Sequence, residues 1–95
     1  MTLKAGTTYR LRLINILTAP IAEVELSADS VRQTWHPTSK DGADVPESLR
    51  RAEPALKRIG VGETYDFEWT PTRVVDAVLE FRIERTMLRQ HVRVR

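Results

Sequence analysis

The segment Thr64-Tyr65-Asp66-Phe67-Glu68-Trp69 decides the fold class of this chain. Its aromatic side chains alternate with carboxylates, and this alternation places the two kinds of side chain on opposite faces of a β-strand. Gly60 and Gly62 precede the segment and Pro71 follows it, and glycine and proline favour the turns that bound strands. The sequence therefore predicts a half-buried strand over Thr64–Trp69, with its aromatic face in a core.

The same period of two residues recurs along the chain. It predicts further half-buried strands over Thr7–Ile16, Ala22–Leu26, Val78–Arg85 and around Val92 and Val94. Less regular strands are expected over Val31–His36 and near Ala55–Ile59, with turns at Ala19-Pro20 and Ala28-Asp29-Ser30. Several short strands at near-regular spacing indicate an all-β sandwich or barrel.

The middle of the chain lacks this alternation. Asp41-Gly42 is a turn signal, and Pro46–Ala52 begins with proline, which is favoured at the first position of a helix. Pro54 would end such a helix, and the span is too short to be stable by itself. We therefore expect one short helical turn within a loop.

Length and composition describe one small globular domain over residues 1–95. Apolar residues make up 41% and charged residues 29% of the chain, which is ordinary globular composition. No stretch approaches the roughly 20 apolar residues of a membrane helix, so no membrane is expected. The segment Met1–Gly6 lacks the apolar run of a signal peptide. Two interpretations stay open: a cytoplasmic protein as the sequence stands, or an exported protein whose signal is not part of this sequence.

Charge and cysteine content exclude several functions. The net charge of +2 comes from interleaved acidic and basic residues, which give no strong long-range field. The last stretch is richer in arginine (Arg82, Arg85, Arg89, Arg93 and Arg95), and we interpret it as a solvated strand face. The sequence contains no cysteine, so disulfides, thiolate chemistry and cysteine-ligated metals are excluded.

Three stretches carry a resemblance to a known family. Gly6–Ile16, with Tyr9, Arg10, Arg12 and Asn15, resembles the G-x-x-Y-R-x-R-x-x-N strand that opens cupredoxin domains of bacterial multicopper oxidases. Lys40–Pro46 is similar to the K-D-G-A-D loop of those domains, and Gly60–Pro71 to their G-E-x-Y-D turn and strand. The stretches follow the order of the family and together span about residues 3 to 94.

The resemblance implies a Greek-key β-sandwich and a periplasmic origin. Physical reasoning agrees with parts of it: Tyr9 and Tyr65 can bury their rings with a polar hydroxyl at the edge, and Trp35 and Trp69 are large enough to fill the space between sheets. Gly60 and Gly62 permit a tight turn with positive φ. A blue-copper site, however, needs two histidines and a cysteine, so oxidase activity is not implied.

The candidate metal ligands are few. One interpretation of His36, Asp41 and Asp44, which lie close in sequence, is a weak surface site for Cu(II) or Ni(II). His91 is a weaker candidate because it lies among basic residues. The competing interpretation is a histidine at a strand end beside an ordinary turn. No other cofactor is expected.

The sequence contains no motif that indicates a catalytic or nucleic-acid-binding function. The pairs Glu23 with Glu25 and Asp66 with Glu68 are explained by exposure of one strand face to solvent. No serine has the glycine frame of a nucleophile elbow, and Gly60-Val61-Gly62 lacks the lysine and helix of a phosphate loop. The aromatic residues occupy the apolar phase of their strands, which disfavours base stacking.

The sequence therefore predicts a non-catalytic structural or interaction module, cupredoxin-like and copper-free. A sandwich of this kind exposes strand edges that need a protein partner or self-association, so a dimer is expected. The alternative is a metal-binding or metal-tolerance protein that holds Cu(II) or Ni(II) through its histidines and carboxylates.

Overall fold

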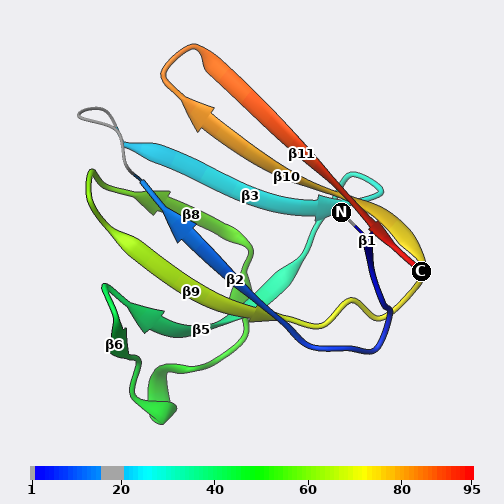
Figure 1. Cartoon of the computed structure of the whole chain (residues 1–95), viewed down its shortest axis with the longest axis horizontal. Helices are drawn as coiled ribbons and strands as arrows, with labels where there is room; N and C mark the ends of the chain where they lie inside the picture. Colours follow the sequence, from blue (N-terminus) through cyan, green and yellow to red (C-terminus); the bar gives the residue numbers. More distant parts are fainter. Residues whose placement is uncertain (1, 16–20) are drawn as a thin grey trace.

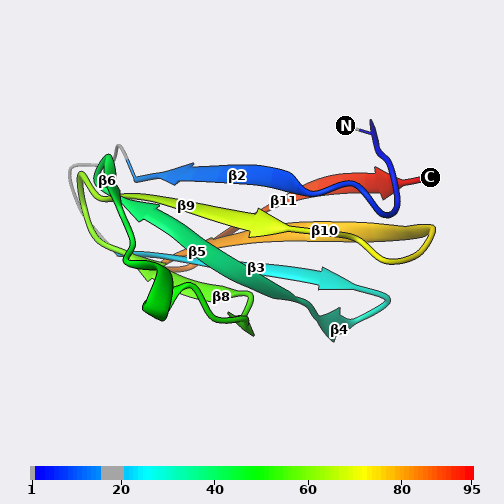
Figure 2. The same cartoon turned by 90° about the horizontal axis from the view of Figure 1, so that it is seen from below.

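Two β-sheets face each other as a sandwich in the computed structural model of the chain, which describes residues 2–15 and 21–95 (Figures 1 and 2). The molecule measures 37 × 34 × 19 Å, so it is flat along the direction viewed in Figure 1. The predicted all-β sandwich is confirmed. No helix among the described residues has the length and apolar character needed to cross a membrane.

The first sheet contains the amino- and carboxyl-terminal strands. Its order is β1 (Thr2–Leu3), β11 (Thr86–Val94), β10 (Val75–Ile83) and β3 (Ala22–Ala28). The far edge of β3 pairs with both β4 (Val31–Arg32) and β8 (Leu56–Ile59). All these pairs are antiparallel except β1 with β11, which is parallel.

The second sheet is built around β9 (Thr64–Trp69). This strand lies between β2 (Tyr9–Ile14) and β5 (Thr34–Lys40), both antiparallel to it. β5 also pairs with the two short strands β6 (Ala43–Asp44) and β7 (Glu53–Pro54). The register of β5 on β9 shifts between Pro37 and Ser39, where the proline cannot donate to a regular ladder.

The strand predictions agree with the structure where alternation is strong. β9 has the predicted bounds, and β2, β3, β8 and β10 overlap the predicted ranges. The predicted Val31–His36 strand divides into β4 and the start of β5, and the predicted last strand extends back to Thr86 as β11. The strands β1, β6 and β7 have two residues each, too few to show a period.

The predicted helical turn and one of the predicted loops can be compared with the structure. The expected helical turn is the 3₁₀ turn η1 (Glu47–Leu49), with Pro46 at its amino-terminal boundary. Asp29 and Ser30 join β3 to β4 with φ of 50° and 64°, as a two-residue hairpin turn requires. The turn predicted at Ala19-Pro20 lies outside the described residues.

Stacked aromatic rings fill the centre of the sandwich. Trp35 of β5 and Phe67 of β9 are fully buried, with ring centroids 4.1 Å apart. Trp69 is also buried, so both tryptophans lie between the sheets as predicted. From the first sheet, β3 contributes its inward-facing residues Ala22, Val24, Leu26 and Ala28.

A set of hydrogen bonds around Asn15, which we call the register junction, fixes the end of β2 against the turn between β8 and β9. The Asn15 N–H donates to the Glu63 carbonyl (3.1 Å), and the Gly62 N–H donates to the Asn15 carbonyl (2.8 Å). The Asn15 side-chain amide donates to the Ile59 carbonyl (2.9 Å). Asparagine at this position therefore joins the end of β2 to both sides of the turn between β8 and β9.

The loop at Asp41 reaches the start of the same strand. The Asp41 N–H donates to the Thr64 carbonyl (2.7 Å), and the Thr64 N–H donates to Asp41 Oδ1 (2.8 Å). The three stretches that resemble cupredoxin domains therefore meet in space, at one end of β9.

The two glycines of the turn differ in their roles. Gly62 has φ of +77°, as predicted, because its conformation is one that other residues rarely adopt. Gly60 does not have a positive φ. Its N–H donates to Glu63 Oε1 (2.6 Å), and a Cβ there would lie 2.7 Å from that oxygen. A side chain at position 60 would therefore displace the Glu63 carboxylate from this hydrogen bond.

We expect Trp35→Ala to lower the free energy of unfolding by about 3–5 kcal/mol, because it removes a buried ring and its stacking contact with Phe67. That loss is a large share of the roughly 5–14 kcal/mol expected for a domain of this size. Urea unfolding monitored by circular dichroism measures it. The control Val74→Ala, at a side chain 72% exposed, should change stability by less than about 0.5 kcal/mol. Equal effects of the two substitutions would contradict the assigned core.

Candidate functional site

The predicted metal ligands lie on both sheets. His36 is exposed on β5, opposite Glu68 of β9. Asp41 occupies the turn between β5 and β6, where its carboxylate caps the Thr64 N–H, and Asp44 lies on β6. His91 lies on β11 of the first sheet and lines a shallow hollow with Thr2, Asp76 and Arg93.

These four residues do not form one site. Within the part of the chain that the structure describes, no group of three or more histidine, cysteine, aspartate or glutamate side chains is placed to hold a metal ion. In addition, the Asp41 carboxylate already accepts a hydrogen bond from the Thr64 N–H of β9. The metal-site prediction therefore rests on separate donors, and it stays a prediction.

The outer face of the first sheet carries an ion-pair ladder. Arg82 of β10 contacts both Glu23 (3.0 Å) and Glu25 of β3, and Arg32 donates to Glu25 at 2.5 Å. The hydrogen bonds from Arg32 and Arg82 lower the pKa of Glu25. Glu23 and Glu25 face outward as predicted, and their partners are arginines of the same sheet.

The prediction that Asp66 is exposed to solvent is wrong. Its side chain is only 1% exposed, because Arg10 and Arg12 of β2 fold over it. Arg10 Nε donates to Asp66 Oδ2 (2.9 Å), and Arg12 donates from Nε (3.0 Å) and Nη2 (3.0 Å). The hydrogen bond from Arg12 is the main cause that lowers the pKa of the Asp66 carboxyl.

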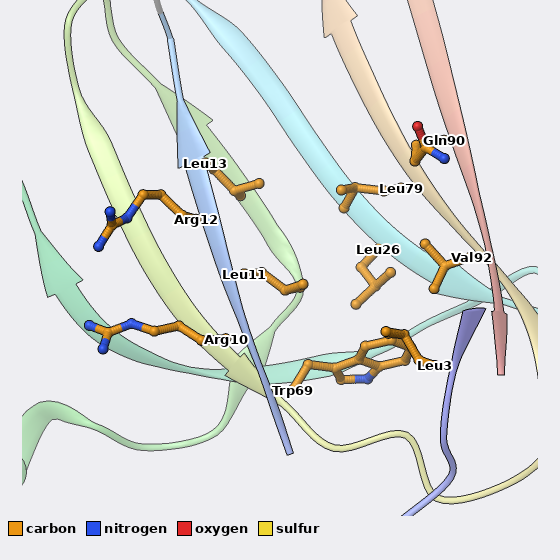
Figure 3. Close-up of a pocket in the computed structure, with 10 residues that line it drawn as sticks. All are labelled: Leu3, Arg10, Leu11, Arg12, Leu13, Leu26, Trp69, Leu79, Gln90 and Val92. Atoms are coloured by element: carbon orange, nitrogen blue, oxygen red, sulfur yellow. The ribbon is translucent and has the colours of Figure 1, made fainter. Parts of the chain in front are cut away.

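The candidate site is an apolar cleft between the two sheets (Figure 3). Its volume is about 220 Å³, and seven of its ten lining residues are apolar: Leu3, Leu11, Leu13, Leu26, Trp69, Leu79 and Val92. In Figure 3, Leu11 and Leu13 extend from β2 toward Leu26, while Arg10 and Arg12 extend to the other side of β2. The cleft is thus a continuation of the core that reaches the surface.

The mouth of the cleft runs along β2. Four consecutive residues of β2, Arg10 to Leu13, line it, although alternate side chains of a strand point to opposite faces. Consecutive residues can line one hollow only at the edge of a strand. From β11, by contrast, only the alternate residues Gln90 and Val92 take part.

Open strand edges lie on both sides of this mouth. β2 ends the second sheet, and among the described residues nothing pairs with its outer edge. β11 pairs with β1 only at Arg93 and Val94, so its Thr86–Val92 edge has no partner within the described ranges. Unpaired backbone groups at a strand edge are a template for another strand.

The register junction shows which backbone groups of β2 are available. The N–H and C=O of Asn15 point toward the β8–β9 side, and antiparallel pairing alternates the direction at each residue. The backbone groups of Leu13 and Leu11 therefore face β9, and those of Ile14, Arg12 and Arg10 face outward. The outer edge of β2 thus presents the backbone of its two arginines beside their side chains.

Sequence reasoning assigned the cleft leucines to a core and did not find the cleft. The alternation in Tyr9–Ile14 does indicate an inward face with Leu11 and Leu13. It carries no signal for whether a further strand covers that face, since the covering depends on the order of strands in each sheet. Comparison of the chain with family models, with curated proteins and with solved structures gave no match.

We expect the stability contributed by Asp66 to depend on pH. Its folded pKa lies below the unfolded value of about 3.9, so the contribution is complete at neutral pH and is lost as the pH falls through the folded pKa. Asp66→Asn should lower the free energy of unfolding by about 1–3 kcal/mol at pH 7, because the buried carboxylate is lost from two arginines. The difference from the unmodified protein should shrink below about pH 5. Urea unfolding across pH measures both, and a constant difference down to pH 2 would contradict the ion pair.

Metal binding is tested by calorimetric titration of metal-stripped protein with Cu(II) and Ni(II). Because no three donors converge among the described residues, we expect only weak, non-stoichiometric binding. His36→Ala/His91→Ala should behave like the unmodified protein. Micromolar or tighter binding at one site per chain, lost in this variant, would favour the metal-handling alternative.

Proposed function

We propose that this domain is a non-catalytic interaction module, cupredoxin-like in type, that binds an extended segment of polypeptide in the cleft between its sheets. The observation that carries the proposal is the apolar cleft with its mouth along the outer edge of β2, with which no described strand pairs. A strand placed there would cover apolar side chains and pair backbone groups in one step.

The size and lining of the cleft suit side chains rather than a small polar substrate. About 220 Å³ is below the usual range of pockets for drug-sized ligands, which begins near 300 Å³. Its polar lining residues are Arg10, Arg12 and Gln90. Of these, Arg10 and Arg12 are paired with Asp66, so neither is set up as an acid or a base.

The cupredoxin-like assignment rests on the three stretches that meet at the register junction. Residues of these stretches stabilise the fold there, because Asn15, Asp41 and Glu63 make the hydrogen bonds that join β2, β5 and β9. The chain contains no cysteine, which a blue-copper centre requires. The resemblance to multicopper oxidases therefore supports a shared scaffold and carries no redox role.

Exposed apolar side chains elsewhere support association as well. Leu88 and Met87 of β11 are about half exposed at the tip of the β10–β11 hairpin (56% and 49%). Together with the open edges they form surfaces that self-association would cover. The dimer therefore remains a prediction, checked by light scattering at increasing protein concentration.

The proposed function is tested by selecting random short segments, displayed on yeast, for binding to the domain. We expect segments that bind the unmodified protein and fail to bind Leu79→Trp, in which a larger ring fills the cleft. The matched control is Val78→Trp, because the adjacent residue of β10 points to the outer face of the first sheet. Selection of no segment that distinguishes these two variants would refute the proposal.

A further inference from the structure

We infer that the occupant of the cleft is an extended segment in which apolar residues alternate with acidic residues, added as a strand to the free edge of β2. The inference rests on the proposed function and names the chemistry of the partner. It requires an apolar face toward the cleft, an acidic face toward the arginines of β2, and backbone groups free to pair.

The charge at the edge favours an acidic partner. Arg10 and Arg12 border the mouth of the cleft at the strand edge, and their side chains extend to the opposite side of β2. β2 contains no acidic residue. The two guanidinium groups share the single carboxylate of Asp66, and their side chains remain 53% and 63% exposed. Outward side chains of an added strand would lie directly beside these arginines, where carboxylates form favourable cross-strand pairs.

The chain itself contains a strand of the required pattern. β9 pairs with the inner edge of β2 and reads Tyr65-Asp66-Phe67-Glu68-Trp69, with aromatic residues toward the core and acidic residues toward Arg12 and Arg10. The side chains of β2 therefore already accept an apolar–acidic strand on one edge. The inferred partner repeats that relation on the other edge.

The backbone at the free edge is placed for pairing. The N–H and C=O groups of Arg10, Arg12 and Ile14 face away from β9, as the register junction shows. β2 has six residues, so a segment of similar length would use all three outward pairs of groups. The apolar side chains of such a segment would then enter the cleft beside Leu11 and Leu13.

A folded second copy does not provide such a segment. Its two apolar–acidic strands, β3 and β9, have both edges occupied within their own sheets. Its open edges at β2 and β11 carry Arg10 and Arg12, and Arg89 and Arg93. β8, which pairs only with β3 among the described strands, carries Lys57 and Arg58. Pairing any of these edges with β2 would set like charges side by side, which is unfavourable.

The test uses the whole domain and a capped peptide, Val-Glu-Leu-Glu-Val-Glu, which matches β2 in length at six residues. Titration is followed by amide NMR shifts, and we expect the largest shifts at the Arg10 and Arg12 amides. Replacing every glutamate of the peptide by lysine should weaken binding about tenfold or more, since favourable cross-strand pairs become repulsive. Leu79→Trp should weaken binding of the original peptide, and Val78→Trp should not.

Strand addition is tested separately by N-methylation of the peptide. Alternate amides of an added strand face β2, so methylating one alternate set should abolish binding and methylating the other should leave it within about threefold. Equal effects of the two sets would overturn strand addition. Equal affinity for the lysine peptide would overturn the acidic preference.

The display selection separates failure of this inference from failure of the proposed function. If cleft-dependent segments are found but they lack acidic alternation, the module stands and its inferred partner is wrong. If the peptide instead dissociates a dimer formed through β2, a second copy is the occupant and the inference is again overturned.

Discussion

The register of β2 on β9 is the constraint on which the rest of the structure depends. Because the period of a strand is two residues, a slip by one position would turn the leucines of β2 outward and its arginines into the core. The hydrogen bonds of Asn15 to both sides of the β8–β9 turn prevent that slip. The buried carboxylate of Asp66 also favours this register, because it pairs with Arg10 and Arg12 only when the strands are aligned as observed.

With the register fixed, the cleft follows from the order of strands. Among the described residues, β2 lies at the end of its sheet and β11 pairs with β1 only near its carboxyl end, so the apolar interior reaches the surface between them. An open strand edge beside exposed apolar side chains promotes aggregation in a protein that never covers it. The interaction proposed for the domain thus arises from the same geometry that forms its core.

The sequence predicted the features that depend on local alternation or on local turn residues. The aromatic face of β9, the inward leucines of β2 and the helical turn at Glu47–Leu49 each follow from residues close together in the chain. It could not predict the burial of Asp66, because the arginines that cover this carboxylate lie more than fifty positions away, at 10 and 12. The sequence could not predict the cleft either. Alternation indicates the face to which a side chain points, and it does not indicate which element lies opposite that face.

The sequence distance between paired strands has a consequence for folding. β10 and β11 pair across a two-residue connection, from Ile83 to Thr86, whereas the nearest pair of β2 and β9 joins Ile14 to Thr64. Short loops close at low entropic cost and distant pairs close late. We expect the β10–β11 hairpin to form early and β2 to dock among the last strands. The edge that borders the cleft is then among the last parts of the sandwich to be completed during folding.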